Sequence, residues 1–289
     1  MTRFIHLPDG DRLACEVSTP DRWTEKDPTI LMVHGLCGSH ESPYLVRLAK
    51  KFYKQRMRTI RINLKGCGSG KGHAKRIYHV DSSHDIWYAV ERIKKETPDT
   101  EIIVVGFSLG GNVVLKMAGE QGKRAKQRIR RIIAVSPPID MQSSAKLLSK
   151  SRLYERYFMR CLRADILFLH TQFDDLPPLE VPNDMTLKEF DEFYIAPQSG
   201  YGSAKEFYGA SSSGRLIPDI CVETYILFSQ DDPIVDHTIL ETVELPANIE
   251  IKVTKQGGHM GYLGVPGKGR GFYWLDATIM EWVRMRSSA

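Results

Sequence analysis

The sequence predicts an α/β protein with a doubly wound, mostly parallel sheet. Short, nearly continuous apolar runs recur along the chain, which is typical of parallel strands buried on both faces. Helical patterns separate the early runs, so strand and helix alternate. The composition, 42% hydrophobic and 26% charged over 289 residues, is that of a globular protein and excludes disordered and collagen-like classes. This length favours one large domain, or one domain that carries an insertion.

Six apolar runs are the expected parallel strands. The run at 59–62 is the weakest, because Arg61 interrupts it. An antiparallel hairpin at the sheet edge is expected before them, since residues 3–7 and 13–18 flank a turn in which Gly10 can adopt a positive φ. The six runs are 29–33, 59–62, 102–105, 132–135, 225–228 and 249–253.

Four segments outside the strands are expected to be helices. In residues 42–53, for example, apolar side chains recur at i, i+3, i+4, i+7 and i+8, so they share one helix face. The four segments are 42–53, 81–95, 112–118 and 274–283.

The alternation of strand and helix breaks between residues 140 and 219. Helical-looking pieces at 144–164, 186–194 and 203–210 are separated by proline- and glycine-containing segments, and 166–170 fits either a helix or a strand. We therefore expect a cap over one end of the sheet: residues 1–139 and 220–289 form the core, and 140–219 form the cap. The cap is rich in large apolar side chains, some of which should line a pocket.

A serine between two glycines follows the run at 102–105. In Gly106-Phe107-Ser108-Leu109-Gly110, small residues at −2 and +2 let a strand and a helix approach closely around a strained turn. Such a turn lifts the Ser108 hydroxyl above the sheet and directs a helix N-terminus, with its free N–H groups, at the reaction centre. The pattern predicts that Ser108 is a catalytic nucleophile.

His259 and Asp232 are the predicted partners of Ser108. A serine hydroxyl needs a base to accept its proton, and His259 lies in a glycine-rich loop after the last strand-like run. The imidazole in turn needs an acid, and Asp232, at the expected strand end, is preferred over its neighbour Asp231. Loops that follow parallel strands meet at one edge of a sheet, so the three side chains can converge there.

The backbone N–H groups of Leu36 and Leu109 are the predicted oxyanion hole. Leu36 lies in the segment HGLCG directly after the run at 29–33, where glycines allow the backbone to turn sharply. His34 of the same segment is expected to have a structural role, because it stands at the end of the strand. This chemistry needs no metal and no organic cofactor, and we expect none.

Two other motifs are interpreted as structural. The glycine-rich run at 65–70 lacks the spacing of a phosphate-binding loop, so we expect a tight loop rather than a nucleotide site. The basic cluster at 123–131 is interpreted as a solvated helix end, because no aromatic residues interleave its charges. The five cysteines form no CxxC pair and favour a reducing, cytoplasmic setting.

The motifs together resemble the α/β-hydrolase superfamily, most of all its type-4 branch of YheT-like esterases and monoacylglycerol lipases. The resemblance rests on GFSLGGN, HGLCGSHESPY, NLKGCGSG and GGHMGYLG, and in the cap on residues 186–191 and 203–220. It implies an eight-stranded, mostly parallel sheet with a helical cap after strand six, and hydrolysis of carboxylic esters. Lys65 stands where the branch usually has an arginine. We expect no counterpart of the N-terminal membrane anchor of its eukaryotic members, and therefore no membrane-bound lipase role.

The resulting hypothesis is a serine hydrolase of carboxylic esters that works through an acyl-enzyme intermediate. Short- to medium-chain acyl esters or monoacylglycerol-like lipids are the expected small-molecule partners. No nucleic-acid partner and no transmembrane segment are expected, while peripheral membrane contact and the oligomeric state stay open. Two alternatives are a ligand-binding protein that keeps the hydrolase scaffold without turnover, and a hydrolase of thioester, amide or carbon–carbon bonds.

Overall fold

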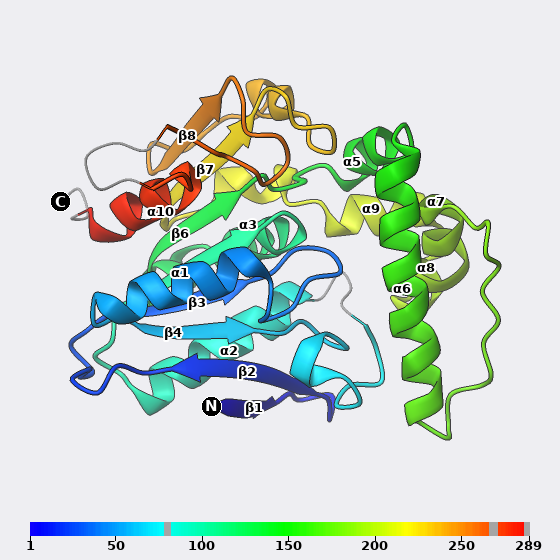
Figure 1. Cartoon of the computed structure of the whole chain (residues 1–289), viewed down its shortest axis with the longest axis horizontal. Helices are drawn as coiled ribbons and strands as arrows, with labels where there is room; N and C mark the ends of the chain where they lie inside the picture. Colours follow the sequence, from blue (N-terminus) through cyan, green and yellow to red (C-terminus); the bar gives the residue numbers. More distant parts are fainter. Residues whose placement is uncertain (78–81, 266–270, 286–289) are drawn as a thin grey trace.

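The computed structural model places all eight strands in one sheet (Figure 1), and it describes residues 1–77, 82–265 and 271–285. The strand order is β1-β2-β4-β3-β5-β6-β7-β8, with parallel pairing throughout except at β1–β2 and β2–β4. The strands are β1 (Thr2–His6), β2 (Arg12–Ser18), β3 (Thr29–Val33), β4 (Arg58–Ile62), β5 (Ile102–Phe107), β6 (Ile129–Val135), β7 (Glu223–Ser229) and β8 (Ile249–Thr254).

The predicted edge hairpin and all six predicted parallel strands are present. In the hairpin, Phe4 pairs with Ala14, and Gly10 in the turn has a φ of 90°. The weak run becomes β4, in which Arg61 is only half-buried while its neighbours Ile60 and Ile62 are buried. The polar residue therefore interrupts the apolar pattern without ending the strand.

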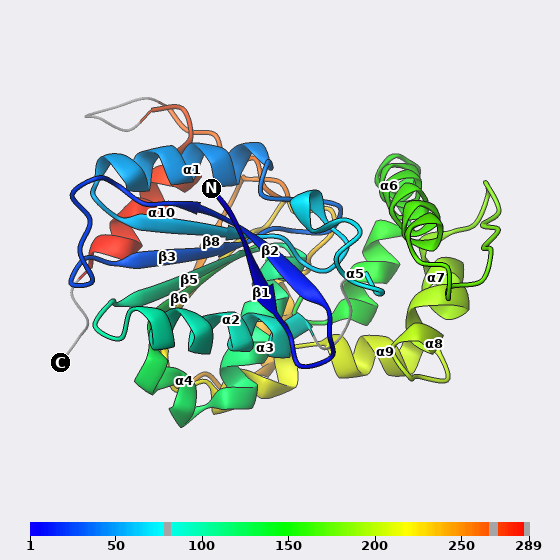
Figure 2. The same cartoon turned by 90° about the horizontal axis from the view of Figure 1, so that it is seen from below.

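Helices cover both faces of the sheet (Figure 2). Both faces need cover, because apolar side chains of the strands point alternately to one face and the other. On one face, α1 (Pro43–Lys54) and α10 (Trp274–Arg284) pack on Ile103 and Val105. On the other, α2 (Ser82–Glu96) and α3 (Leu109–Gln121) cover Ile102 and Val104, and the short α4 (Lys123–Arg128) follows α3. Successive strand residues point to opposite faces, so the central strands β3, β5, β6 and β7 contribute to two separate apolar cores.

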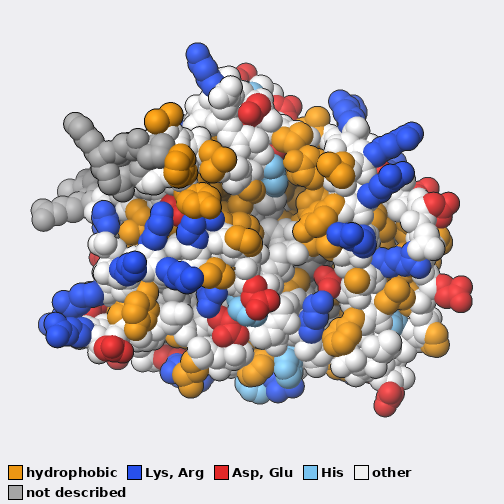
Figure 3. Space-filling view, in the orientation of Figure 1, with side chains coloured by type: hydrophobic (Ala, Val, Ile, Leu, Met, Phe, Trp, Pro, Cys, Tyr) orange, Lys and Arg blue, Asp and Glu red, His pale blue; other side chains and the backbone are white. Residues whose placement is uncertain are grey.

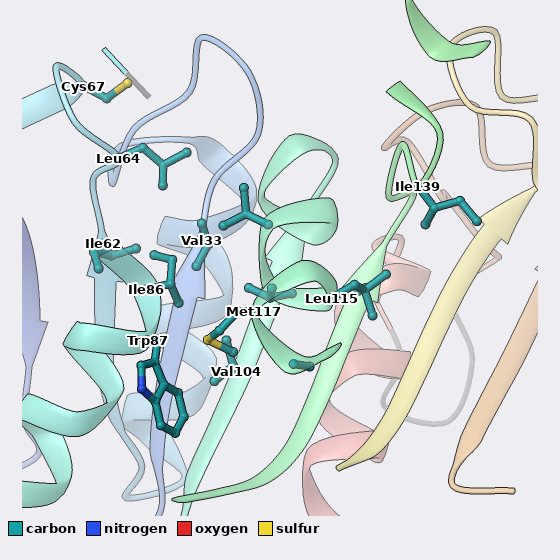
Figure 4. Close-up of a cluster of buried hydrophobic side chains, with 14 of the residues drawn as sticks. Val33, Ile62, Leu64, Cys67, Ile86, Trp87, Val104, Leu115, Met117 and Ile139 are labelled. Carbon is teal, nitrogen blue, oxygen red and sulfur yellow. The ribbon is translucent and has the colours of Figure 1, made fainter. Parts of the chain in front are cut away.

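The apolar core under α2 and α3 packs the sheet against the helix that follows the predicted turn at Ser108. Figure 4 shows Val33 and Val104 of neighbouring strands facing Ile86 and Trp87 of α2, and Met117 of α3. All five side chains are buried. The helix that follows Ser108 is thus fixed on the sheet by its own apolar face.

The chain between β6 and β7 is helical and lies beyond one end of the sheet (Figure 1). Residues 166–170, which fitted either a helix or a strand, belong to the long helix α6. A π-helical turn, Asp191–Ile195, joins two of the short helices. The helices are α5 (Met141–Leu148), α6 (Arg152–Gln172), α7 (Leu187–Phe190), α8 (Ala196–Gln198) and α9 (Ala204–Ser211). Across the described residues, no helix has both the length and the apolar character needed to cross a membrane.

Candidate active site

Ser108 lies on a strained turn between β5 and α3. Its backbone has a φ of 50° and a ψ of −121°, a conformation that residues other than glycine rarely adopt. A Cβ on Gly106 would lie 2.3 Å from the carbonyl oxygen of Gly110, and a Cβ on Gly110 would lie 2.4 Å from that of His34. Larger residues at these two positions would push the strand and the helix apart. The close approach expected from the sequence pattern therefore exists.

The side chains of Ser108, His259 and Asp232 form one hydrogen-bonded chain. His259 Nδ1 lies 2.9 Å from Asp232 Oδ2 and 3.1 Å from Oδ1. With Nδ1–H donating to this carboxylate, Nε2 is left to accept the Ser108 hydroxyl proton, and Oγ lies 2.7 Å from it. The three residues follow β5, β7 and β8. Parallel strands bring these loops to one edge of the sheet, although Ser108 and His259 are 151 residues apart.

Asp232 and Asp231 have different environments. The Asp232 side chain is 1% exposed, and its Oδ1 also accepts the backbone N–H groups of Ile234 at 2.8 Å and Val235 at 3.1 Å. Asp231 instead accepts hydrogen bonds from the Ser229 hydroxyl and from the N–H of Gly258 at 2.8 Å. These bonds, the one from Ser229 first, hold the pKa of Asp231 below its usual value. Asp231 thus fastens the loop that carries His259, a positioning role that the sequence analysis missed.

Leu36 and Leu109, the predicted oxyanion donors, both line the cavity that contains Ser108. Leu109 is the first residue of α3, where backbone N–H groups have no acceptor within the helix. The preceding Gly35 donates its N–H to the Tyr44 hydroxyl at 3.2 Å, and a Cβ there would lie 3.0 Å from that of Ser108. The backbone around Leu36 is consequently held against the Ser108 turn.

His34 takes no part in the hydrogen-bonded chain. It is fully buried, its Nδ1–H donates to the Gly35 carbonyl oxygen at 2.8 Å, and its Nε2 accepts the Leu64 N–H at 3.1 Å. Burial lowers the pKa of His34 to about 4, so the ring is neutral near pH 7. The Nε2 bond joins the segment after β3 to the loop after β4, and the Nδ1 bond fixes the orientation of the ring. This agrees with the structural role expected for His34.

A largely apolar cavity of about 110 Å³ extends from Ser108 under the helices between β6 and β7. His259 and Ile234 line it on the core side. Of the large apolar side chains between residues 140 and 219, Phe158, Phe207 and Tyr208 line the cavity, whereas others such as Leu153 are exposed to solvent. The apolar wall contributed by the helices includes Met141, Leu148, Phe158, Leu162, Leu187 and Phe207.

A family model described as the alpha/beta hydrolase fold matches residues 28–264. The chain belongs to the α/β-hydrolase fold family. The eight-stranded, mostly parallel sheet confirms the predicted fold class. After β5, the hydrolase carries the turn at Ser108 that the sequence motif predicted.

Several relatives of this hydrolase are named as esterases or lipases. It is 27% identical over 288 residues to the Escherichia coli protein named "Putative esterase YheT", covering 96% of this chain and 83% of that one. It is also 27% identical to a monoacylglycerol lipase of Saccharomyces cerevisiae, covering 81% of this chain and 55% of the yeast enzyme. A third relative at 27% identity, covering 88% and 61%, is the yeast medium-chain fatty acid ethyl ester synthase/esterase 2.

Solved structures share the fold of the hydrolase at low sequence identity. The esterase Est1E of Butyrivibrio proteoclasticus, with ferulic acid bound, aligns with a TM-score of 0.62 over 98% of this chain and 97% of its own, at 16% identity. The Pyrococcus furiosus esterase Pf2001 aligns with a TM-score of 0.64 over 98% and 89%, also at 16% identity. At this identity the likeness establishes the fold.

Two polar groups in the cavity wall of the hydrolase had no signal in the sequence. Asp191, in the π-helical turn, accepts a hydrogen bond from the Tyr208 hydroxyl of α9 at 2.6 Å. Burial raises the pKa of Asp191 to about 7. Asn112 of α3 donates to the Ser211 carbonyl oxygen at 2.8 Å and accepts the Ser213 N–H at 3.0 Å, which ties α3 to the end of α9.

The glycine-rich loop at 65–70 contains a buried ion-pair centre. Lys65 contacts the carboxylates of Asp9, Asp11 and Asp85, which come from the hairpin turn and from α2. Burial raises the pKa of Asp85 to about 7, although the lysine opposes this. Lys65 thus connects the edge hairpin to α2.

The interpretation of the 123–131 cluster as a solvated helix end was only partly right. The cluster continues into β6, where Arg131 is fully buried and pairs with Glu223 at 2.7 Å. Arg128 and Arg130 pair with Glu91 at 3.1 Å and Glu101 at 2.6 Å. The sequence analysis missed these pairs because their acidic partners lie on other elements.

Proposed function

We propose that this protein is a serine hydrolase that cleaves carboxylic esters through an acyl-enzyme intermediate. The observation that carries the proposal is the chain of hydrogen bonds from Ser108 through His259 to Asp232 at the mouth of an apolar cavity. The names of the relatives support ester hydrolysis in general. The serine mechanism and the acyl group are our own assignments.

In the first half-reaction, Ser108 Oγ bonds to the ester carbonyl carbon and its proton passes to His259 Nε2. Asp232 stabilises the resulting imidazolium through Nδ1–H. The N–H groups of Leu36 and Leu109 donate to the tetrahedral oxyanion, a contribution of roughly 3 kcal/mol per donor in comparable sites. The intermediate collapses when the bond to the alcohol oxygen breaks and His259 returns its proton to that oxygen.

In the second half-reaction, a water molecule replaces the departed alcohol. His259 takes a proton from the water as its oxygen bonds to the acyl carbon, and the second tetrahedral intermediate uses the same two N–H donors. Breaking the bond to Oγ releases the carboxylic acid, and His259 returns the proton to Ser108. Both halves use this chain's own groups.

The acyl group is assigned to the cavity beneath a cap formed by residues 140–219. Its wall is predominantly apolar, and each methylene that fits against it contributes up to about 0.8 kcal/mol. Short- to medium-chain acyl esters, or monoacylglycerol-like lipids, fit this wall better than charged or sugar-like acyl groups. The cytoplasmic setting stays a prediction.

The test combines labelling with turnover. The wild-type protein should react with a fluorophosphonate probe and hydrolyse p-nitrophenyl esters, with kcat/KM highest at roughly C4–C8. Ser108→Ala should abolish both while leaving the thermal midpoint nearly unchanged. Labelling that persists in Ser108→Ala would place the nucleophile elsewhere. If the wild type binds the esters without being labelled or turning them over, the ligand-binding alternative is correct.

A further inference from the structure

The outer surface of α6 carries a stripe of four arginines. Arg152, Arg156, Arg160 and Arg163 follow one another at intervals of four, four and three residues, so they lie along one face of the helix. At 1.5 Å per residue the stripe is about 16 Å long. They line one side of a surface groove, with residues 182–186 on the other side.

None of these four arginines has an ion-pair partner in the part of the chain that the structure describes. The one interaction found for them is the Arg160 guanidinium 6.0 Å from the ring centroid of Tyr157. Arg128, Arg130 and Arg131 of the 123–131 cluster, in contrast, each pair with a glutamate. Glu155 and Asp184 also line the groove, so the four arginines leave this surface with an excess of positive charge that is complementary to an external anion.

Apolar side chains accompany the arginine stripe. Leu153 is 79% exposed and Tyr157 is 46% exposed, each one position beyond an arginine. The groove also contains Met159, Leu167 and Met185. Figure 3 shows Lys and Arg side chains interspersed with hydrophobic ones over the α6 side of the molecule, beside a hollow between this side and the core.

We propose that this face of α6 docks the protein on an anionic phospholipid surface. A guanidinium group can donate two parallel hydrogen bonds to the oxygens of one phosphate. Leu153 and Tyr157 would enter the boundary between the lipid headgroups and the acyl chains. A helix with basic and apolar side chains in adjacent stripes has the composition of an interfacial helix. A nucleic acid or an acidic protein would use the arginines but would leave Leu153 without a favourable environment.

The geometry also connects docking to the cavity. Phe158 of α6 lines the cavity that contains Ser108, one position away from the exposed Tyr157. A lipid surface against α6 therefore lies close to the cavity wall. The docking proposal does not depend on the proposed ester hydrolysis, because binding can be measured without turnover.

The experiment measures partitioning of the full-length chain onto vesicles. Binding to phosphatidylcholine vesicles should be weak, whereas vesicles containing phosphatidylglycerol should bind the protein and release it at high salt. The variant Arg152→Gln/Arg156→Gln/Arg160→Gln should lower the partition coefficient about a hundredfold, since each basic residue near an anionic surface contributes about fivefold. Arg156→Gln alone should lower it about fivefold, which keeps the test usable if the triple variant folds poorly.

A matched control removes the same charge elsewhere. Lys123→Gln/Arg124→Gln/Lys126→Gln changes three exposed cations on α4 and should alter the partition coefficient less than about twofold. Equal losses in the two triple variants would mean that net charge, not α6, drives binding, and would overturn the proposal. Hydrolysis of dissolved p-nitrophenyl butyrate should be the same in both.

Further arms separate a lipid surface from other anions. Leu153→Ser should lower partitioning about tenfold without changing its salt dependence, because it removes exposed apolar area that docking on the lipid would bury. Unchanged partitioning of Leu153→Ser, together with equally strong binding of an oligonucleotide or of soluble glycerol phosphate, would show a general anion site and contradict the proposal. Equal binding to phosphatidylcholine and phosphatidylglycerol vesicles would also contradict it.

Discussion

The sheet core and the helices between β6 and β7 meet at the candidate active site, but they are built on different principles. The core positions Ser108, His259 and Asp232 through strand ends, close backbone contacts and buried hydrogen bonds. The helical segment contributes an apolar wall, a buried carboxyl group and a charged outer face. We therefore expect the core to determine the chemistry and the helices between β6 and β7 to determine which acyl groups reach Ser108, and paired variants in the two regions test this division.

The largest effect is expected at the acid of the core. Asp232→Asn should lower kcat by a factor on the order of 10⁴, because the imidazole loses both the group that fixes its tautomer and the charge that stabilises its protonated form. Asp231→Asn is the matched control and should cost less than about tenfold, since it only loosens the loop of His259. Steady-state kinetics with p-nitrophenyl butyrate measure both. The reverse ranking would mean that the acid has been misassigned by one residue.

A second pair of variants compares backbone tolerance in the two regions. Gly110→Ala should destabilise the protein by about 4 kcal/mol or more, because its Cβ would lie 2.4 Å from the His34 carbonyl oxygen. Gly209→Ala, within α9, should stabilise it by about 0.5–1 kcal/mol, because its Cβ meets no atom within 4 Å and alanine favours the helix. Urea unfolding of each variant gives both values. Similar changes in the free energy of unfolding for the two variants would contradict the expected difference in packing between Gly110 and Gly209.

The buried carboxyl group of Asp191 should make the stability of the protein depend on pH. The pKa of Asp191 is about 7 in the folded protein against 3.8 for an ordinary aspartate, so the folded state retains a proton that the unfolded state releases between these values. Its contribution to stability is present below about pH 4 and is lost as pH rises to 7, by up to about 4 kcal/mol. Asparagine cannot ionise, so Asp191→Asn should gain stability relative to wild type between pH 4 and 8. Urea unfolding at the two pH values measures it, and a constant difference would contradict the assignment.

The smallest expected effect concerns acyl selectivity. Phe158→Ala removes part of the wall and so enlarges the cavity. For a p-nitrophenyl ester whose acyl chain is longer than the wild-type optimum, kcat/KM should rise about fivefold relative to that for butyrate. Phe168→Ala removes the same ring from the same helix, but there the ring lies outside the cavity and 5.7 Å from the Lys71 ammonium. It should leave the selectivity unchanged. Equal shifts in the two variants would indicate a general loosening of α6.

The regions also differ in how far the sequence predicts them. In the core, strand positions, the turn at Ser108 and the order of the predicted site residues follow from local patterns, because buried parallel strands and close strand–helix approaches impose them within a few residues. In the cap, the sequence predicts helices and an apolar surplus but not which side chains face the cavity. Phe158 and Phe168 look alike in the sequence, and only one of them lines the cavity.

By itself the sequence determined the fold class, which strand each predicted site residue follows, and the presence of a helical segment between β6 and β7. Only the tertiary structure decided the contacts between distant residues: Lys65 with Asp9 and Asp85, Arg131 with Glu223, and Asp191 with Tyr208. The physical reason is that local patterns record which face of an element is buried, whereas the partner of a buried polar group depends on the register and packing of separate elements. For the same reason the sequence did not show that the α6 arginines have no ion-pair partner among the described residues.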